Sequence, residues 1–147
     1  MAKQREFDVV VWGASGFTGH LVADYLAQTH GAGGDLRWAI AGRNREKLEQ
    51  VRDEILPGGK RKALPILIAD SGDPASLAAL VARTRVICST VGPYARYGTA
   101  LVAACTEAGT DYCDLTGEVQ WMTRVIPTYQ GAAEASGARI VHTCGYD

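Results

Sequence analysis

The sequence predicts an α/β fold in which one doubly wound parallel sheet of about six strands is covered by helices. Short β-branched runs alternate with amphipathic helical stretches along all 147 residues. A glycine-rich turn joins the first run to the first helical stretch, which is typical of a Rossmann-like fold. The length fits a single domain, residues 1–147, and a 47% hydrophobic composition provides enough apolar side chain for a core.

Six apolar runs predict the strands, because each is short and bounded by turn residues. In order along the chain, they cover residues 7–12, 36–41, 63–69, 85–90, 111–115 and 138–143. Strands that alternate with helices in this way lie parallel and are joined by right-handed crossovers.

Five helical stretches separate these runs. They cover residues 17–29, 44–56, 73–81, 98–108 and 119–136. In the first, the apolar residues at helical spacing are Leu21, Val22, Tyr25 and Leu26. Asn44 and Asp73 are expected to cap the second and third helices at their N-termini, and Gly109 is expected to end the fourth.

Charge and composition exclude several classes of function. Fifteen basic residues against sixteen acidic residues give a net charge of −1, which predicts neither a nucleic-acid partner nor a basic membrane-binding patch. No apolar run approaches the ~18–20 residues of a membrane span, and the charged start is unlike a signal peptide, so a cytoplasmic protein is expected. A homodimer is among the assemblies that the sequence allows.

The four cysteines at positions 88, 105, 113 and 144 match no metal-binding spacing. Their apolar neighbours predict reduced, unreactive thiols that pack as small hydrophobic groups. No metal site is expected.

The turn after the first strand has the form Gly13-x-x-Gly16-x-x-Gly19. Glycines permit a sharp turn there and let backbone N–H groups approach a pyrophosphate, whose charge the following helix N-terminus stabilises. The side-chain hydroxyl groups of Ser15 and Thr18 add further hydrogen-bond donors. The residues expected to bind the dinucleotide here are Gly13, Ser15, Gly16, Phe17, Thr18 and Gly19.

The end of the second strand predicts which dinucleotide binds. NAD-binding domains place a carboxylate there for the ribose 2′-hydroxyl, whereas this chain has Arg43 and Asn44 and no acid. A guanidinium binds a 2′-phosphate through paired charge-assisted hydrogen bonds. Arg43 alone also fits a solvated surface residue, but its position favours NADP (NADPH) as the cofactor, and argues against FAD and S-adenosylmethionine.

Two further strand ends supply candidate cofactor residues. They are Asp70, Ser71, Thr90, Gly92, Pro93 and Tyr94. Asp70 either accepts a hydrogen bond from the adenine amino group or caps the following turn. The turn after the fourth strand lies beside the switch point of the sheet, where the nicotinamide half is expected. Tyr94 there lines either the hydride-transfer site or only the wall of the pocket.

With these residues in place, the chain resembles the N-terminal NADP-binding domain of saccharopine dehydrogenase-like oxidoreductases, especially the branch that includes trans-acting enoyl reductases. The matching stretches are residues 11–19, 41–48, 91–94, 111–118 and 144–147. The resemblance implies hydride transfer between NADPH and a small-molecule or acyl substrate. It also implies a downstream region that completes the substrate site, so the chain is interpreted as a fragment that is inactive alone.

The resemblance assigns no catalytic residue. Asp114, Thr116 and Glu118 follow the fifth strand on the expected substrate side, and a role in positioning substrate is one interpretation. A helix N-terminus capped by Thr116, with Glu118 near the positive end of the helix dipole, explains the same residues.

Two other functions remain open. A short-chain dehydrogenase would use a Tyr-x-x-x-Lys pair, but no tyrosine stands four residues before any lysine of this chain, so this alternative requires the pair to lie beyond Asp147. A non-catalytic module that senses NADP(H) is also compatible with the sequence, because every motif discussed concerns binding rather than turnover.

Overall fold

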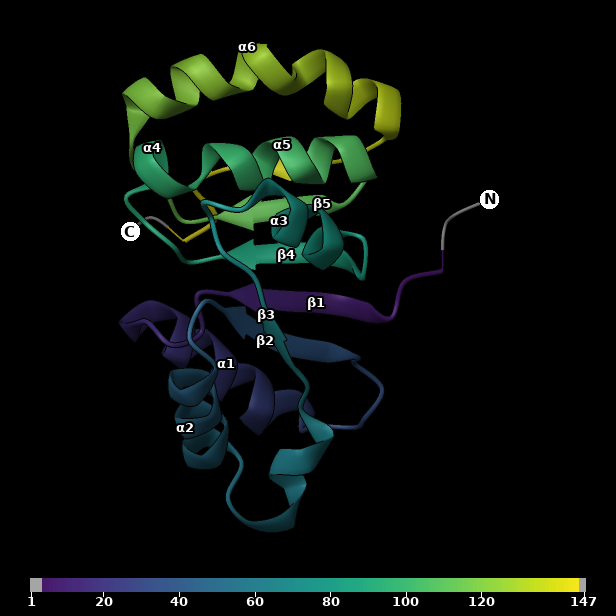
Figure 1. The fold of residues 1–147 in the computed structure, drawn as a ribbon, viewed down its shortest axis with the longest axis vertical. Coiled ribbons are helices and arrows are strands. Elements are labelled where there is room, and N and C mark those ends of the chain that lie inside the picture. Colours follow the sequence, from purple (N-terminus) through teal and green to yellow (C-terminus); the bar gives the residue numbers. More distant parts are fainter. Residues whose placement is uncertain (1–3, 146–147) are drawn as a thin grey trace.

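The computed structural model describes residues 4–145 as a six-stranded parallel sheet in the order β3-β2-β1-β4-β5-β6. The strands are β1 (Phe7–Trp12), β2 (Trp38–Gly42), β3 (Ile66–Ile68), β4 (Thr84–Ser89), β5 (Asp111–Asp114) and β6 (Ile140–Val141). The order reverses on either side of β1, and every neighbouring pair is parallel, which confirms the predicted doubly wound fold (Figure 1).

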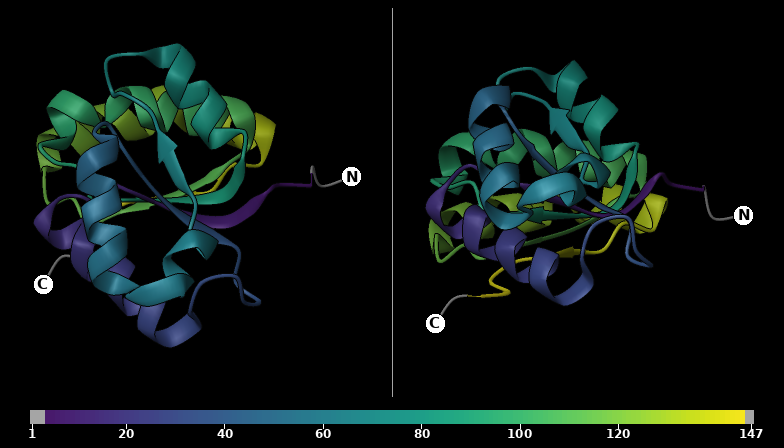
Figure 2. Two further views of the ribbon diagram at one scale, coloured as in Figure 1. Left: turned by 60° about the horizontal axis from the view of Figure 1, so that its bottom comes forward. Right: turned by 90° about the horizontal axis from the view of Figure 1, so that it is seen from below.

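Helices cover both faces of this sheet, as Figure 2 shows. They are α1 (Phe17–His30), α2 (Arg45–Ile55), α3 (Pro74–Val81), the short α4 (Tyr94–Tyr97), α5 (Thr99–Ala108) and α6 (Val119–Ser136). On one face α1 packs beside α2, and on the other α3, α5 and α6 lie side by side. Alternate residues of β1 therefore enter two separate cores, Val11 on the α1 side and Val10 on the α5 side.

The predicted helix caps are confirmed. The Asn44 side chain accepts a hydrogen bond from the Lys47 backbone N–H at 3.1 Å, and Asp73 accepts one from Ala75 at 3.1 Å. Gly109 ends α5 with a left-handed φ of 69°. These three caps fix where α2 and α3 begin and where α5 ends.

The buried face of α1 differs from the one that its apolar spacing suggests. Leu21 and Tyr25 are 54% and 65% exposed, whereas the buried residues are Gly19, Ala23 and Ala27. Small side chains face the sheet because α1 lies very close to the end of β1. Leu21 and Tyr25 are consequently left on the outer side of the helix, whereas Val22 and Leu26 are partly buried and pack against the core.

The third strand is shorter than predicted. Residues Gly58–Ala63 form a 3₁₀ helix, and the strand covers only Ile66–Ile68. Pro65 has no N–H to donate, although its carbonyl accepts from the Ile40 N–H at 3.2 Å, so regular pairing with β2 begins after it. The other predicted strands agree with the structure to within two residues at either end.

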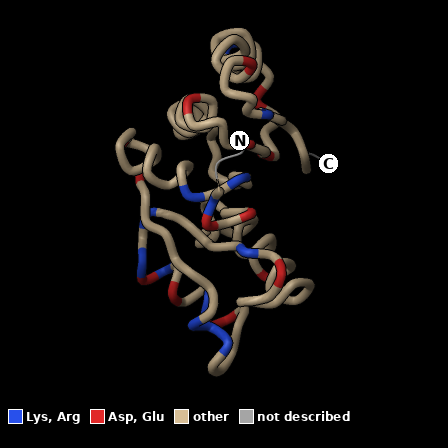
Figure 3. The backbone as a smooth tube through the Cα atoms, turned by 90° about the vertical axis from the view of Figure 1, so that its right-hand side faces the viewer, with Lys and Arg blue, Asp and Glu red and all other residues tan. Residues whose placement is uncertain are grey.

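Charged residues of both signs are interspersed along the backbone, with no large region of one sign (Figure 3). Within residues 4–145, no helix is long and apolar enough to cross a membrane. The same residues contain no cluster of His, Cys, Asp and Glu that is arranged to hold a metal ion.

Candidate functional site

The glycine loop packs so tightly that two of its positions have no room for a side chain. Gly13 has a φ of +90°, and a Cβ there would lie 2.4 Å from a Val91 methyl group. A Cβ on Gly19 would lie 2.0 Å from the Gly13 carbonyl oxygen. Glycine at these positions therefore lets α1 begin directly against the loop, with its N-terminus beside the end of β1.

The first turn of α1 has free backbone N–H groups. Gly16 is the N-cap, no side chain caps the helix, and the first turn contains no acidic residue. Exposed N–H groups at a helix N-terminus carry a partial positive charge and suit an anion. This end of α1, built against the glycine loop, has the geometry required to hold a phosphate.

The loop forms one wall of a cleft of about 620 Å³ at the carboxyl ends of β1, β2, β3 and β4. Nine of the residues predicted from the sequence line this cleft: Gly13, Ser15, Gly16, Arg43, Asn44, Asp70, Ser71, Thr90 and Gly92. Gly42 and Val91, which adjoin predicted residues, also line the cleft, as do residues that sequence reasoning missed: Trp12, Lys47, Gly72, Arg96 and Tyr97. The strand ends that the topology brings together are therefore those expected to contact a dinucleotide.

Five predicted residues do not line the cleft, namely Phe17, Thr18, Gly19, Pro93 and Tyr94. Phe17 is 84% exposed, whereas Gly19 acts through its packing against the loop. Tyr94 lies in the core at 4% exposure and donates a hydrogen bond to the Ser89 carbonyl at 3.2 Å. Burial raises the pKa of Tyr94 to about 12, so this phenol stays protonated at neutral pH.

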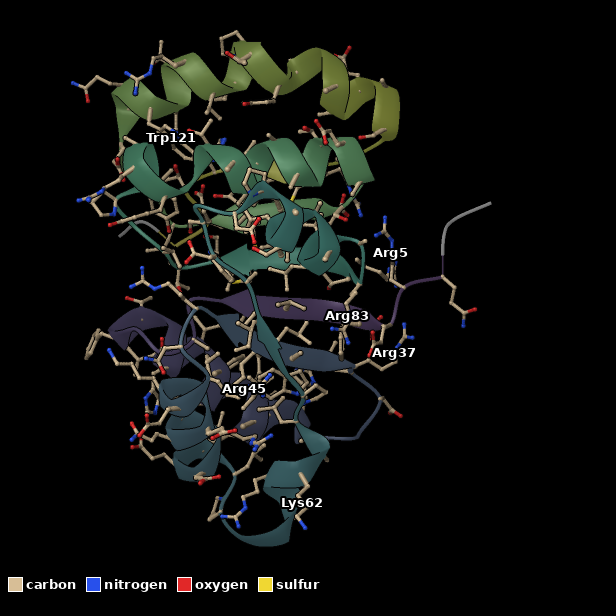
Figure 4. All side chains as sticks on the ribbon, viewed as in Figure 1. Arg5, Arg37, Arg45, Lys62, Arg83 and Trp121 are labelled. Carbon is tan, nitrogen blue, oxygen red and sulfur yellow. The ribbon has the colours of Figure 1, made fainter. Side chains whose placement is uncertain are left out.

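The tip of β2 presents cations without counter-charges. Arg43 and Lys47 are exposed and line the cleft, and neither takes part in an ion pair among residues 4–145. By contrast, Arg37 pairs with Asp8 and Arg83 pairs with Glu6 at the amino-terminal ends of the strands, on the side of the sheet away from the cleft (Figure 4). The cations at the cleft are thus available to an anionic ligand. Lys47 follows the Asn44 N-cap by three residues, a spacing that would have identified it from the sequence.

The ends of β3 and β4 hold the rest of the cleft in shape. Asp70 Oδ1 accepts a hydrogen bond from the Gly72 N–H at 2.7 Å, which supports the turn-capping interpretation, while adenine contact stays a prediction. The Thr90 hydroxyl donates to the Trp12 carbonyl at 3.0 Å and thereby joins the end of β4 to that of β1. The Gly92–Pro93 peptide is cis. Beyond it, Arg96 and Tyr97 on α4 form the wall opposite the tip of β2.

The three substrate-side candidates all make structural contacts. The Glu118 carboxylate accepts from the Tyr94 and Ala95 N–H groups at 2.6 and 3.1 Å, so it caps α4 rather than its own helix. The Thr116 hydroxyl accepts from the Glu118 N–H at 3.1 Å at the start of α6. These contacts favour the interpretation in which the residues organise helix N-termini. A role toward substrate stays a prediction.

Asp114 is completely buried and is the centre of a polar network. Its Oδ2 accepts from the Tyr112 hydroxyl at 2.7 Å and from His142 Nδ1 at 2.8 Å, and its Oδ1 accepts two backbone N–H groups. Burial raises the pKa of Asp114, but the hydrogen bonds from His142 and Tyr112 outweigh burial and hold that pKa below its ordinary value. His142 belongs to no motif that would have identified it from the sequence. Tyr146 and Asp147 of the terminal motif lie outside the described residues.

A model of the family described as the saccharopine dehydrogenase NADP-binding domain matches residues 9–141. The chain is 51% identical to a Mycobacterium tuberculosis protein that is named provisionally as a trans-acting enoyl reductase. The match extends over 146 residues, which is 99% of this chain. It is 46% identical over 144 residues to a Mycobacterium bovis protein named trans-acting enoyl reductase, covering 98% of this chain. The chain spans only 34% and 33% of the lengths of these two relatives.

Solved structures share the fold at low sequence identity. Saccharopine dehydrogenase (L-Glu forming) from Saccharomyces cerevisiae matches 95% of this chain and 27% of its own with a TM-score of 0.72 at 19% identity. Triphenylmethane reductase from Citrobacter sp., solved with NADP(H), matches 92% of this chain and 48% of its own with a TM-score of 0.67 at 19% identity.

Proposed function

Because this chain belongs to the saccharopine dehydrogenase NADP-binding domain family, we propose that its cleft binds NADP(H) for hydride transfer by a longer oxidoreductase. Membership of this family agrees with the resemblance seen in the sequence. One observation carries the proposal. Arg43 and Lys47 lie at the tip of β2 without an ion-pair partner among residues 4–145, and no carboxylate stands at the position where NAD-binding domains have one.

The residues of the cleft fit the parts of NADP(H). Two loop positions exclude a Cβ, and this would let the backbone of the glycine loop come close to a pyrophosphate bound at the α1 N-terminus. Arg43 and Lys47 would hold the 2′-phosphate, and the turn after β4 would border the nicotinamide half. When bound, NADPH supplies a hydride, and this chain's residues bind and orient it.

The substrate site is proposed to lie largely in the remainder of the full-length protein. The chain spans about a third of the length of the curated relatives that it matches. The names of these relatives favour reduction of an enoyl group on an acyl substrate as the reaction of the whole protein. A cytoplasmic location and a homodimer stay predictions.

Arg43→Ala is expected to weaken NADPH binding about ten- to hundredfold, because hydrogen bonds to a charged group contribute roughly 1.5–3 kcal/mol. NADH lacks the 2′-phosphate, so its affinity is expected to stay unchanged. Titration of this chain with each cofactor, followed by nucleotide fluorescence or calorimetry, measures both constants. The test therefore compares the ratio of two affinities rather than one value.

Arg61→Ala provides the matched control for this substitution. Arg61 lies in the 3₁₀ helix before β3, away from the cleft lining, and makes only an exposed ion pair with Asp53 at 3.7 Å. Its removal should leave both cofactor affinities unchanged. Equal binding of NADPH and NADH by the wild-type chain would contradict the assignment of the β2 tip.

Arg96→Ala is expected to have a different signature. Arg96 lies across the cleft from the tip of β2, beside the turn that would border the half shared by both cofactors. We therefore expect NADPH and NADH to weaken by the same factor, about two- to fivefold for a solvent-screened contact. A loss confined to NADPH, measured in the same titrations, would instead place Arg96 against the 2′-phosphate.

Turnover separates the proposed enzyme from a module that only senses NADP(H). The full-length protein should oxidise NADPH when an enoyl substrate is supplied, as followed by the loss of nicotinamide absorbance. Cofactor binding without oxidation across enoyl and imine substrates would favour the sensing function.

A further inference from the structure

Three of the four cysteines lie near the carboxyl ends of neighbouring strands. Cys88 on β4 and Cys113 on β5 are direct partners in the parallel ladder, and Cys144 follows β6. Cys88 and Cys113 are half-buried and Cys144 is exposed. Cys105 stands apart, because it is fully buried on the core-facing side of α5. From the sequence, all four thiols are expected to be equally unreactive. The structure instead separates them into a group of three, Cys88, Cys113 and Cys144, and the isolated Cys105.

A local irregularity brings Cys144 to the same face as the other two. Thr143 has a φ of +62°, and its N–H donates to the Asp114 side chain instead of to the ladder. The next residue, Cys144, makes the backbone contact to β5 instead, and its N–H donates to the Asp114 carbonyl at 2.7 Å. This extra residue acts as a β-bulge and reverses the alternation of side chains, so Cys144 falls on the side of Cys113. Burial raises the pKa of Cys144, and the nearby Cys113 adds to this shift.

Cys88 and Cys113 lie side by side on one face of the sheet, because they are register partners on adjacent parallel strands. A hydrogen bond from the Cys113 thiol to the Cys88 sulfur lowers the pKa of Cys88, although burial opposes this effect. The same hydrogen bond, together with burial, raises the pKa of Cys113, and burial alone raises that of Cys105. The opposite directions of these two pKa shifts favour Cys88 as the thiol that reacts first and Cys113 as its partner.

We propose that Cys88 and Cys113 form a peroxide-sensitive thiol pair that closes into a disulfide between β4 and β5. Hydrogen peroxide oxidises the Cys88 thiol to a sulfenic acid and is itself reduced to water. The Cys113 sulfur then attacks the Cys88 sulfur, so that an S–S bond forms and a second water leaves with the sulfenic oxygen.

The backbone of the sheet allows this bond. Neighbouring strands lie roughly 4.8 Å apart, which falls within the roughly 4.4–6.8 Å between Cα atoms that disulfides span. Because Cys88 and Cys113 are in register, no strand needs to slide for the two sulfurs to meet. Thr90, two residues beyond Cys88, donates to the Trp12 carbonyl, so the pair lies next to the cleft without lining it. This inference does not depend on the proposed cofactor function.

Alkylation rates test the first part of the proposal. With iodoacetamide at neutral pH, followed by peptide mass spectrometry, Cys88 should react faster than Cys144, although Cys144 is more exposed. Cys113→Ala removes the hydrogen-bond donor and should slow Cys88 several-fold, even though it uncovers the thiol. Cys105→Ala is the matched control and should leave the rate at Cys88 unchanged. Slower reaction at Cys88 than at Cys144 in the wild-type chain would overturn this part.

Peroxide treatment tests the disulfide itself. Residues 86–96 and 97–124 form separate tryptic peptides, and the proposal predicts that peroxide links them through Cys88 and Cys113. Cys88→Ser and Cys113→Ser should each abolish this linked species, while Cys144→Ser and Cys105→Ser should retain it. Absence of the link after peroxide, or its persistence in Cys113→Ser, would overturn the proposal. A dominant bond from Cys113 to Cys144 would also overturn it.

Discussion

Gly19→Ala is expected to abolish NADP(H) binding and to destabilise the fold by about 3 kcal/mol or more, at the upper end of overpacking effects. The added Cβ would lie 2.0 Å from the Gly13 carbonyl oxygen, 2.6 Å from the Gly13 carbonyl carbon and 2.8 Å from the Ala14 Cα. All three atoms belong to the backbone, so no side-chain rotation relieves the overlap. Either α1 moves away from the loop or the loop opens, and both changes displace the N–H groups proposed to bind the pyrophosphate.

Gly131→Ala is the matched control, because it makes the same chemical change in the interior of a helix. Gly131 lies in α6, and a Cβ there would meet nothing within 4 Å. Its replacement should leave cofactor affinity unchanged and stabilise the chain by up to roughly 1 kcal/mol. Urea denaturation and NADPH titration of both variants provide the comparison. A Gly19→Ala variant as stable as the wild type would show that the loop and α1 do not pack as described.

The sequence predicted the parts of this fold that depend on local pattern. The six strands and their order of alternation with helices were recovered because each strand is a short apolar run between turn residues. Residues such as Asn44 and Asp73 identified helix starts because a cap needs only neighbouring atoms. Most of the predicted cleft residues line the cleft for a related reason. They lie at the ends of parallel strands, which one sheet edge necessarily brings together.

The errors arose where packing overrides local pattern. Leu21 and Tyr25 have helical spacing, yet they lie on the outer side of α1, because Gly19, Ala23 and Ala27 face the sheet where the helix packs closest. The four residues of α4 are too few to show a helical period, so Arg96 and Tyr97 were missed as lining residues. Tyr94 was expected at the cleft because it follows Gly92 and Pro93 in the turn after β4. Its position in the sequence does not show in which direction its ring points, and the ring is buried in the core.

The polar network around Asp114 could not be predicted from one sequence. His142 lies 28 residues further along the chain, and only the pairing of β5 with β6 brings the two together. Trp121, labelled in Figure 4, packs edge-on against His142 with 5.2 Å between ring centroids, and Tyr112 lies on another side. The network therefore joins the ends of two strands to the first turn of α6. Its residues are buried, so its main effect is expected on stability.

Asp114→Ala is expected to destabilise the chain by about 3–5 kcal/mol, the usual cost of removing one partner from a buried charged network. The substitution leaves His142 Nδ1, the Tyr112 hydroxyl and two backbone N–H groups without their acceptor. Asp111→Asn on the same strand is the control, because Asp111 pairs with the largely exposed Arg139 and its loss should cost much less. Urea denaturation at neutral pH measures both changes.

The pH dependence of this effect follows from the direction of the pKa shift. The pKa of Asp114 lies below its ordinary value of 3.8, so the ionised carboxylate stabilises the folded chain at every pH above that value. This stabilisation is lost as the pH falls through the lower pKa of the folded state. The difference in unfolding free energy between wild type and Asp114→Ala should thus shrink as the pH falls below 3.8. A difference that instead grew as the pH fell below 3.8 would mean that the pKa of Asp114 is raised in the folded chain rather than lowered.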